Sequence, residues 1–120
     1  MVTEVDVRRI ALSFPGAYEQ DSYGGRPSWR TKPRIFTWIR DEPDAVVVWV
    51  ESLAEKEALV ASDLDKFFTT PHYDGHPVVL VRLSAVDVEE VAELIGDSWR
   101  LRAPRSLTKG WNGDRERDVP

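Results

Sequence analysis

Two histidines and an aspartate in one short segment come closest to forming a chemical site. In the run His72-Tyr73-Asp74-Gly75-His76, the side chains of His72, Asp74 and His76 occupy alternate positions. An extended segment would therefore turn all three to one side, and two imidazoles with one carboxylate suit a divalent transition metal. Such sites usually take their ligands from separate elements, however, and Asp-Gly is a common turn pair. We therefore predict no metal and no cofactor, and keep the three residues only as candidate ligands.

The remaining polar residues do not form a recognisable catalytic arrangement. A serine nucleophile needs a base that a third group orients, and no serine lies in a Gly-x-Ser-x-Gly turn. The chain has no cysteine, which excludes a thiol nucleophile, a disulfide framework and cysteine-bound zinc. Gly24-Gly25-Arg26 could cradle a phosphate, but two glycines more often mark a bend. We predict that the protein is not an enzyme.

Basic residues are concentrated in two stretches of a chain whose net charge is −5. Residues 26–40 contain five bases and no acid, residues 100–109 contain four bases and no acid, and residues 41–97 contain fourteen acids against three bases. If the two basic stretches meet in the fold, they form a surface of positive potential. Alternatively, they pair with acids elsewhere, which a pI of about 5.0 favours on charge alone.

The alternation of side chains along a strand indicates which of these bases point outward. In the predicted strand at 26–32, Trp29 lies on the opposite face from Arg30 and Lys32. We therefore expect Trp29 in the core and the two bases in solvent. The candidates for contact with a phosphate backbone are Arg26, Arg30, Lys32, Arg34, Arg100, Arg102 and Arg105.

The other tryptophans offer little for stacking on bases. Trp49 lies in the most apolar predicted strand and Trp99 on the apolar face of the last helix, so we expect both in the core. Trp38 shares the phase of Phe36 and is ambiguous, and Trp111 is the one expected to be exposed. Aromatic stacking on single strands is therefore not predicted.

Capping residues and hydrophobic periodicity indicate the elements that hold these side chains. Thr3, Ser52 and Asp87 are predicted N-caps. The predicted helices are 4–14, 53–61 and 87–102, and the predicted strands are 26–31, 34–40, 45–50 and 77–83. A further helical turn is expected after Ser62, carrying Leu64, Phe67 and Phe68. This order predicts an α+β fold, an antiparallel sheet of about five strands with helices packed on one face.

Length and composition place these elements in one domain, at residues 1–108, followed by a flexible tail at 109–120. No apolar run is long enough to cross a membrane, and the acidic N-terminus does not read as a signal peptide. We expect a cytoplasmic protein that is a monomer or a weak dimer.

An ordered series of short motifs resembles the MmcQ/YjbR family of small α+β domains over residues 4–107. The motifs are Ser13-Phe14-Pro15-Gly16, Tyr23-Gly24, Pro27-Ser28-Trp29-Arg30, Arg34-Ile35-Phe36, Phe67-Phe68-Thr69-Thr70-Pro71-His72, Val79-Leu80-Val81-Arg82-Leu83 and Trp99-Arg100-Leu101-Arg102-Ala103-Pro104. The resemblance implies a fold similar in outline to frataxin and to secretion chaperones. It also implies a double-wing DNA-binding protein, whose wings would be the loops around Gly24-Gly25 and 41–44. The second of these loops is acidic and would repel phosphate.

Two hypotheses for function follow. In the first, the basic strand and helix end hold a DNA backbone without sequence preference. In the second, the domain binds a protein partner or small ligand in the manner of a chaperone, through an apolar patch that Phe36 and Trp38 would supply.

Overall fold

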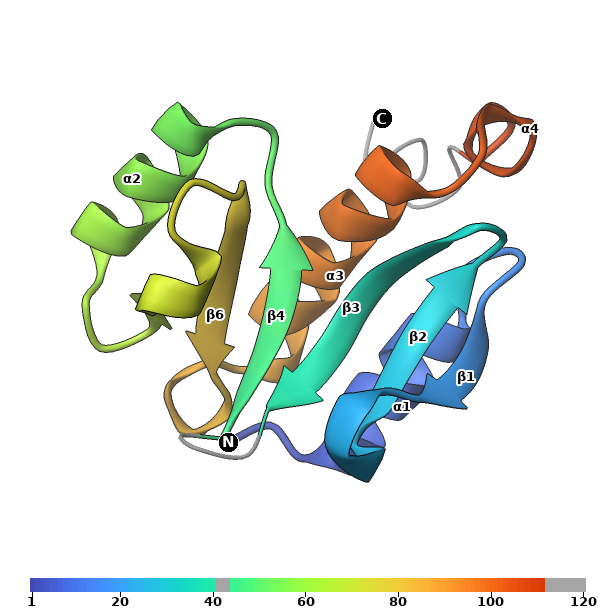
Figure 1. Cartoon of the computed structure of the whole chain (residues 1–120). Coiled ribbons are helices and arrows are strands. Elements are labelled where there is room, and N and C mark those ends of the chain that lie inside the picture. The colour runs from blue at the N-terminus through green and yellow to red at the C-terminus, as the bar shows by residue number, and fades with distance from the viewer. Residues whose placement is uncertain (41–43, 112–120) are drawn as a thin grey trace, which may run out of the picture.

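An antiparallel sheet in the order β1-β2-β3-β4-β6-β5 forms the middle of the computed structural model, which describes residues 1–40 and 44–111 (Figure 1). The strands are β1 (Tyr18–Asp21), β2 (Pro27–Thr31), β3 (Arg34–Arg40), β4 (Ala45–Trp49), β5 (Phe67–Phe68) and β6 (Val78–Arg82). Each neighbouring pair is antiparallel. The predicted fold class is confirmed, and the described residues form six strands because β1 and the short β5 pair at the two edges.

Two of the helices cover the same face of this sheet. The α-helices are α1 (Glu4–Leu12), α2 (Leu53–Ser62), α3 (Val88–Arg102) and α4 (Arg105–Thr108), and the 3₁₀ turns are η1 (Tyr23–Gly25), η2 (Pro71–Tyr73) and η3 (Leu83–Ala85). Helix α1 packs against β2, and α3 packs against β3 and β4. Figure 1 shows both behind the sheet, with α2 beside β6. None of the helices within 1–40 and 44–111 is long and apolar enough to cross a membrane.

The helices begin where the capping residues predict. Thr3 accepts a hydrogen bond from the Asp6 backbone N–H, and the Asp6 carboxylate accepts one from the Thr3 N–H, which completes a capping box. Ser52 accepts from the Glu55 N–H, and Asp87 accepts from the N–H three residues later. Each cap satisfies backbone donors that have no partner within the helix.

The segment after α2 differs from the prediction. Only one turn follows Ser62, in which the backbone N–H groups of Lys66 and Phe67 donate to the Asp63 carbonyl. Phe67 and Phe68 then form β5, paired with Val81 and Leu80 of β6. The two phenylalanines therefore point to opposite faces of a sheet edge rather than along one side of a helix.

A β-bulge divides β3 and changes the face to which its aromatic residues point. Trp38 is opposite Ser28 of β2, but Ile35 is opposite Arg30, so Phe36 is an extra residue on β3. Phe36 is fully buried on the helix side, whereas Trp38 lies on the other face and is half-buried. The predicted patch that joins Phe36 to Trp38 is therefore wrong.

The main core lies between the sheet and helices α1 and α3. Trp29 and Trp99 are both 0% exposed there, which confirms their predicted positions. Trp111, expected to be exposed, is half-buried and meets the rings of Phe14 and Trp99 edge-on. Trp49 was expected in the core but is also half-buried, at the edge of the opposite face. The remainder of the predicted flexible tail, residues 112–120, lies outside the described residues.

Strands β3 and β4 separate at one end, and α3 fills the gap between them (Figure 1). Ser98 of α3 is fully buried at this point. Its hydroxyl donates to the Phe36 carbonyl and accepts from the Trp49 N–H at 2.8 Å. One small polar side chain thus replaces a pair of backbone hydrogen bonds that the separated strands cannot make with each other.

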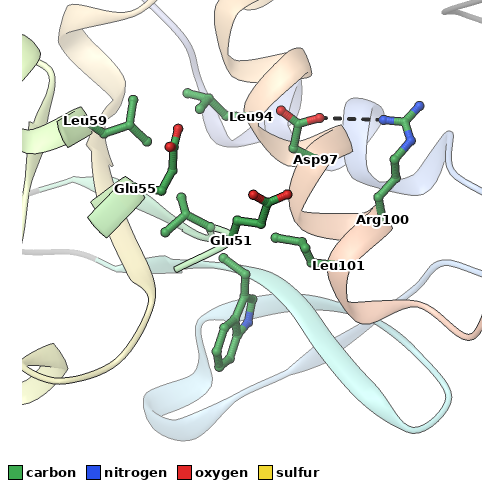
Figure 2. A pocket seen from close by; sticks show the side chains of 9 residues that line it. Glu51, Glu55, Leu59, Leu94, Asp97, Arg100 and Leu101 are labelled. Atoms are coloured by element: carbon green, nitrogen blue, oxygen red, sulfur yellow. Dashed lines mark ion pairs between the residues drawn. The ribbon is translucent and has the colours of Figure 1, made fainter. Parts of the chain in front are cut away.

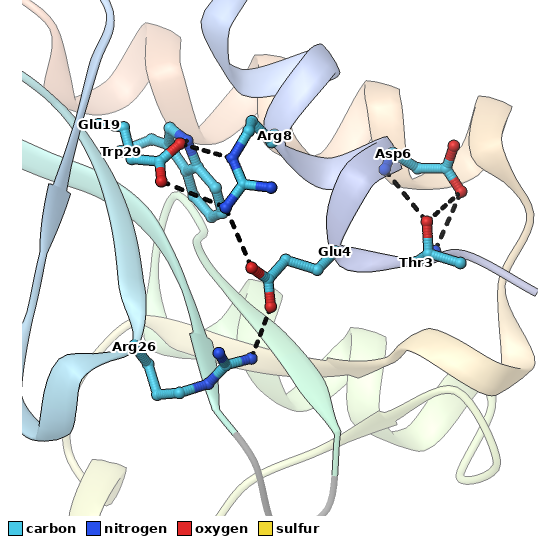
Figure 3. A network of polar contacts seen from close by, with 7 residues as sticks. All are labelled: Thr3, Glu4, Asp6, Arg8, Glu19, Arg26 and Trp29. Atoms are coloured by element: carbon cyan, nitrogen blue, oxygen red, sulfur yellow. Dashed lines mark hydrogen bonds and ion pairs between the residues drawn. The ribbon is translucent and has the colours of Figure 1, made fainter.

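A network of charged side chains ties α1 to β1 and to the start of β2 (Figure 3). Arg8 donates to Glu19 at 2.7 Å and to Glu4 at 3.0 Å, and Arg26 donates to the second oxygen of Glu4 at 2.8 Å. The indole N–H of Trp29 also donates to Glu19, at 3.1 Å. The Arg26 guanidinium, followed by that of Arg8, lowers the pKa of Glu4, and Arg8 lowers the pKa of Glu19.

Candidate functional site

Among the described strand residues, the face of the sheet opposite α1 and α3, here called the open face, carries basic side chains and no acidic ones. The strand register places on it the side chains of Tyr18, Gln20, Ser28, Arg30, Ile35, Trp38, Arg40, Ala45, Val47, Trp49, Phe68, Val78, Leu80 and Arg82. Three of these residues are arginines, one each from β2, β3 and β6, and none is an acid. The acidic side chains of β1 alternate with these and point to the opposite face of the sheet. There Glu19 accepts a hydrogen bond from Arg8.

Arg102 joins this face from the end of α3, through the gap between β3 and β4. Its Nε donates to the Ile35 carbonyl at 3.3 Å, and its guanidinium carbon lies 3.9 Å from the centre of the Trp49 ring. Burial, followed by the positive charge of nearby Arg34, lowers the pKa of Arg102 from its very high ordinary value. Arginine remains charged in this range, so two cations lie near each other at this end of the sheet, neither in an ion pair among the described residues.

The bases form two groups at the two ends of β3. The turn group consists of Arg30, Lys32, Arg34 and Arg102, around the turn between β2 and β3. The end group consists of Arg40 and Arg82, which flank Ala45 on the two strands beside β4. Arg40 comes five positions after Ile35 on β3, or about 17 Å along a regular strand. The two predicted basic stretches, 26–40 and 100–109, therefore do meet, at the turn group.

Aromatic rings hold three of these guanidinium groups in place. Arg40 lies 5.5 Å from the centre of the Tyr73 ring, Arg82 lies 4.2 Å from that of Phe68, and Arg102 stacks on Trp49 as described. Within residues 1–40 and 44–111, Arg30 and these three arginines make no ion pair. Stacking orders a guanidinium without neutralising it, so the charge remains available to an anion.

The other predicted phosphate contacts lie elsewhere. Arg26 is bound to Glu4 within the network on the α1 side (Figure 3). Arg100 pairs with Asp97 at 3.6 Å, on the side of α3 that faces α2. Arg105 is exposed on α4, which begins three residues after Arg102. The structure thus brings four of the seven predicted residues together, the members of the turn group.

Sequence reasoning did not single out Arg40 and Arg82 as site residues. Arg40 is the last base of the first basic stretch, but its face depends on the bulge at Phe36. Arg82 lies in the acid-rich part of the chain, and only the pairing of β4 with β6 brings it beside Ala45. The available signal was the strand phase of Val78–Arg82, which places Val78, Leu80 and Arg82 on one face.

A groove of about 750 Å³ lies along the open face between η1, β3 and η2. Trp38 and Tyr73 form its aromatic wall, with the Trp38 indole N–H donating to the Tyr73 hydroxyl at 3.2 Å. Arg40 and His72 also line it, and the His72 ring meets that of Tyr73 edge-on at 4.7 Å. The hydroxyl of Thr70, another lining residue, is buried without a hydrogen-bond partner among the described residues.

The candidate metal ligands do not converge. His72, Asp74 and His76 are all exposed, in a segment anchored through its backbone. Lys56 of α2 donates its ammonium to the carbonyls of Tyr73 and His76, at 2.7 and 3.0 Å. Among the residues that the structure describes, no group of three or more histidines and carboxylates is placed to hold a metal ion. His72 instead lies at the edge of the groove.

A second groove, of about 480 Å³, lies between α2 and α3 and has the opposite charge (Figure 2). The carboxylates of Glu51, Glu55 and Asp97 project into the space above its apolar wall. That wall includes Leu94 and Leu101, with other apolar side chains from α2 and β4. These carboxylates would repel phosphate here, in contrast to the arginines of the open face.

The structure describes one of the two loops expected to act as wings, and only the last residue of the other. Gly24 and Gly25 both have positive φ, 79° and 80°, in the turn η1 that borders the open-face groove. A side chain would be strained in that backbone conformation. The acidic loop at 41–44 is described only at Asp44, because residues 41–43 lie outside the described residues.

The chain is similar to a protein family and to proteins from mycobacteria and Deinococcus. A family model described as YjbR matches residues 12–101. The uncharacterized proteins Rv2570 of Mycobacterium tuberculosis and Mb2600 of Mycobacterium bovis are each 34% identical, covering 92% of this chain and 96% of the relative. A crystal structure of Deinococcus radiodurans protein DR2400, with a DUF419 family-model domain, matches with a TM-score of 0.74 and 21% identity, over 100% of this chain and 91% of that one. The structural likeness shows a shared fold.

Proposed function

The chain belongs to the YjbR family, and we propose that it is a non-enzymatic DNA-binding protein whose open face holds the phosphate backbone. One observation carries this proposal. Arg30, Arg40 and Arg82 on the open face, with Arg102 from the end of α3, form no ion pair among the described residues, and the described strand residues of this face include no acid. On a chain of net charge −5, such a separation of charge favours an anionic partner.

The spacing of the two basic groups suits a polyanion better than a single small anion. The turn group and the end group are about 17 Å apart along β3, whereas one strand of B-DNA places a phosphate every 3.4 Å of helix axis. About five phosphates therefore fall within that length. Arg30 and Arg102 at one end and Arg40 and Arg82 at the other can contact the same backbone.

The chemistry of these contacts implies binding without sequence preference. Phosphate oxygens are the same at every base pair, so contacts to them set affinity and position but carry no sequence information. The proposal includes no reaction step. The Tyr73 hydroxyl accepts from Trp38 and the His72 ring meets Tyr73 edge-on, so neither supplies the nucleophile–base hydrogen bond of covalent catalysis.

Fluorescence anisotropy with labelled DNA tests the proposed function. The probes are two duplexes of unrelated sequence and two single strands, titrated with protein at several salt concentrations. With about four phosphate contacts we expect a log–log salt slope near −3.6 for duplex and near −2.8 for single strands, equal for the two sequences of each kind. No binding of either form by tens of micromolar protein at about 50 mM salt would reject the proposal.

The groove between α2 and α3 favours a second candidate function, a module that binds a protein partner. Its leucines and carboxylates together match an apolar segment that carries bases (Figure 2). If DNA fails to bind, a peptide of alternating leucine and lysine is the next probe. Leu94→Ala and Glu55→Gln should then each weaken its binding, because one shortens the apolar wall and the other removes a carboxylate.

A further inference from the structure

We infer that the groove between η1, β3 and η2 receives one unstacked base of single-stranded DNA, so that the protein prefers single strands to duplex. This inference rests on the proposed function and names the form of DNA that the open face takes. The groove lies on the same face as the arginines and is bordered by Arg40 of the end group. A backbone bound along β3 would therefore pass its rim.

The volume and walls of the groove fit a flat ring joined to an anion. A volume of about 750 Å³ is within the range of small-molecule sites, which are mostly apolar with a few convergent polar groups. Trp38 is half-buried and presents part of its indole to the groove, and Tyr73 lies beside it at a ring separation of 6.2 Å. Every base has a face that can stack on such rings.

Polar groups around this aromatic wall match the rest of a nucleotide. The Arg40 guanidinium, 5.5 Å from the centre of the Tyr73 ring, is placed to meet a phosphate while the base lies against Trp38. The Thr70 hydroxyl is buried behind the lining and lacks a partner among the described residues, so it can bond a polar edge of the base once its side chain turns toward the groove. None of the described residues lining the groove is acidic, and Arg26 and Arg40 are among them.

The geometry also explains why duplex would bind less well. Bases in a duplex are paired and stacked, so moving one out of the helix requires free energy to break its base pair and its stacking. A single strand has no base pair to break. Duplex can use the arginines but not the groove. Single strands can use both, and base stacking adds to their affinity.

The experiment compares wild-type protein with Trp38→Phe, Arg40→Gln and the control Trp111→Phe. Trp111 packs against Phe14 and Trp99 on the α3 side, so its replacement leaves the groove unchanged. The probes are oligothymidylate, a duplex of equal length, thymidine monophosphate and thymidine. We expect oligothymidylate to bind about tenfold tighter than duplex, and Trp38→Phe to remove about three- to tenfold of that affinity while duplex affinity stays within about twofold.

The indole N–H resonances give a second measurement that does not depend on comparing affinities. We expect oligothymidylate and thymidine monophosphate to shift the Trp38 indole N–H signal, identified by its loss in Trp38→Phe, and Trp111 to stay in place. Equal binding of single strands and duplex with no shift at Trp38 would overturn this inference and leave the proposed function intact. Failure of every DNA probe at low salt would remove both. Binding of thymidine monophosphate without salt-dependent binding of any DNA would overturn both and make the groove a small-ligand site.

Discussion

Arg102 reaches from the C-terminal end of α3 to the open face, and its three contacts illustrate what single residues do in this protein. It donates a hydrogen bond to the Ile35 carbonyl, stacks on the Trp49 ring, and lies within range of the positive charge of Arg34. The stem and the planar head of an arginine can pack while the charge stays accessible. Under the proposed function Arg102 would serve both packing and binding, so the effect of replacing it has to be separated into these two parts.

Replacing Arg102 with lysine separates the two effects. Lysine retains the charge but lacks the planar guanidinium that stacks on Trp49 and bonds the Ile35 carbonyl. We expect Arg102→Lys to lower the free energy of unfolding in urea while keeping most of the salt slope of DNA binding, and Arg102→Gln to reduce both. A salt slope that falls equally in the two variants would show that the charge of Arg102 is not what meets DNA.

Trp29 tests packing alone, since it lies on the helix side and touches no part of the open face. Its ring is 0% exposed and its indole N–H donates to Glu19. Trp29→Ala should lower the free energy of unfolding by about 3–5 kcal/mol, because a large cavity opens between the sheet and α1. Urea denaturation measures the change. A loss below about 1 kcal/mol would mean that the core closes around the missing ring.

At the scale of elements, the junction of α3 with β3 and β4 is the most specific feature. Ser98 stands where the two strands separate and satisfies one backbone group of each. The residue two positions earlier on α3, Gly96, lies so close to Phe14 that an added Cβ would sit 3.2 Å from its ring. Small residues therefore bring α3 close to both the sheet and the end of α1, which positions Arg102 at the gap.

Removing the Ser98 hydroxyl should destabilise this junction. Ser98→Ala leaves the Trp49 N–H and the Phe36 carbonyl without a partner in a buried place. We expect a loss of about 1–3 kcal/mol in the free energy of unfolding, the cost of unsatisfied buried polar groups. The matched control is Ser106→Ala in α4, where the serine is exposed and a near-zero change is expected. Equal stability of the two variants would contradict the bridging role.

Most of the elements could be predicted from the sequence because their signals are local. Thr3, Ser52 and Asp87 cap helices where expected, since a cap depends on the few residues that follow it. The edge strand β5 could not be found, because two residues carry no periodicity and pair only through β6. The bulge at Phe36 was hidden for a similar reason, since it appears only in the register with β2.

The candidate site was predicted less completely than the fold. Alternation alone gave the outward position of Arg30, and the meeting of the two basic stretches followed from charge clustering. Arg82 required the pairing of distant strands, and the stacking of Arg40 on Tyr73 required the path of the η2 segment. Contacts between parts of the chain far apart in sequence leave no mark that one sequence can show.

Across the whole molecule, charge is sorted between the two faces of the sheet. On the α1 side, Glu4 and Glu19 are compensated by Arg8 and Arg26 (Figure 3). On the open face, the arginines rest on aromatic rings instead of carboxylates. The described charges of one face are thus paired with each other, whereas the arginines of the other are in no ion pair among the described residues.

The compensated side predicts a specific dependence of stability on pH. Pairing lowers the pKa of Glu4 and Glu19 in the folded state, so their contribution is present above the ordinary carboxyl value near 4.5 and is lost as pH falls through the lowered values. We expect Glu4→Gln/Glu19→Gln to be less stable than wild type at neutral pH. The difference should shrink as the pH is lowered below that ordinary value, because the wild-type carboxyls then become protonated as well. Urea denaturation at neutral pH and at a series of acidic pH values measures it, and a constant difference would contradict the pairing.

The salt slope of DNA binding in single-arginine variants is the most direct test of the proposal that the open face holds the backbone. Arg30→Gln, Arg40→Gln and Arg82→Gln each remove one charge from this face, and Arg9→Gln removes one from the exposed side of α1. We predict that each open-face variant lowers the magnitude of the log–log slope by about one unit while Arg9→Gln leaves it unchanged. Measurable DNA binding with the wild-type slope in all three open-face variants would contradict the account.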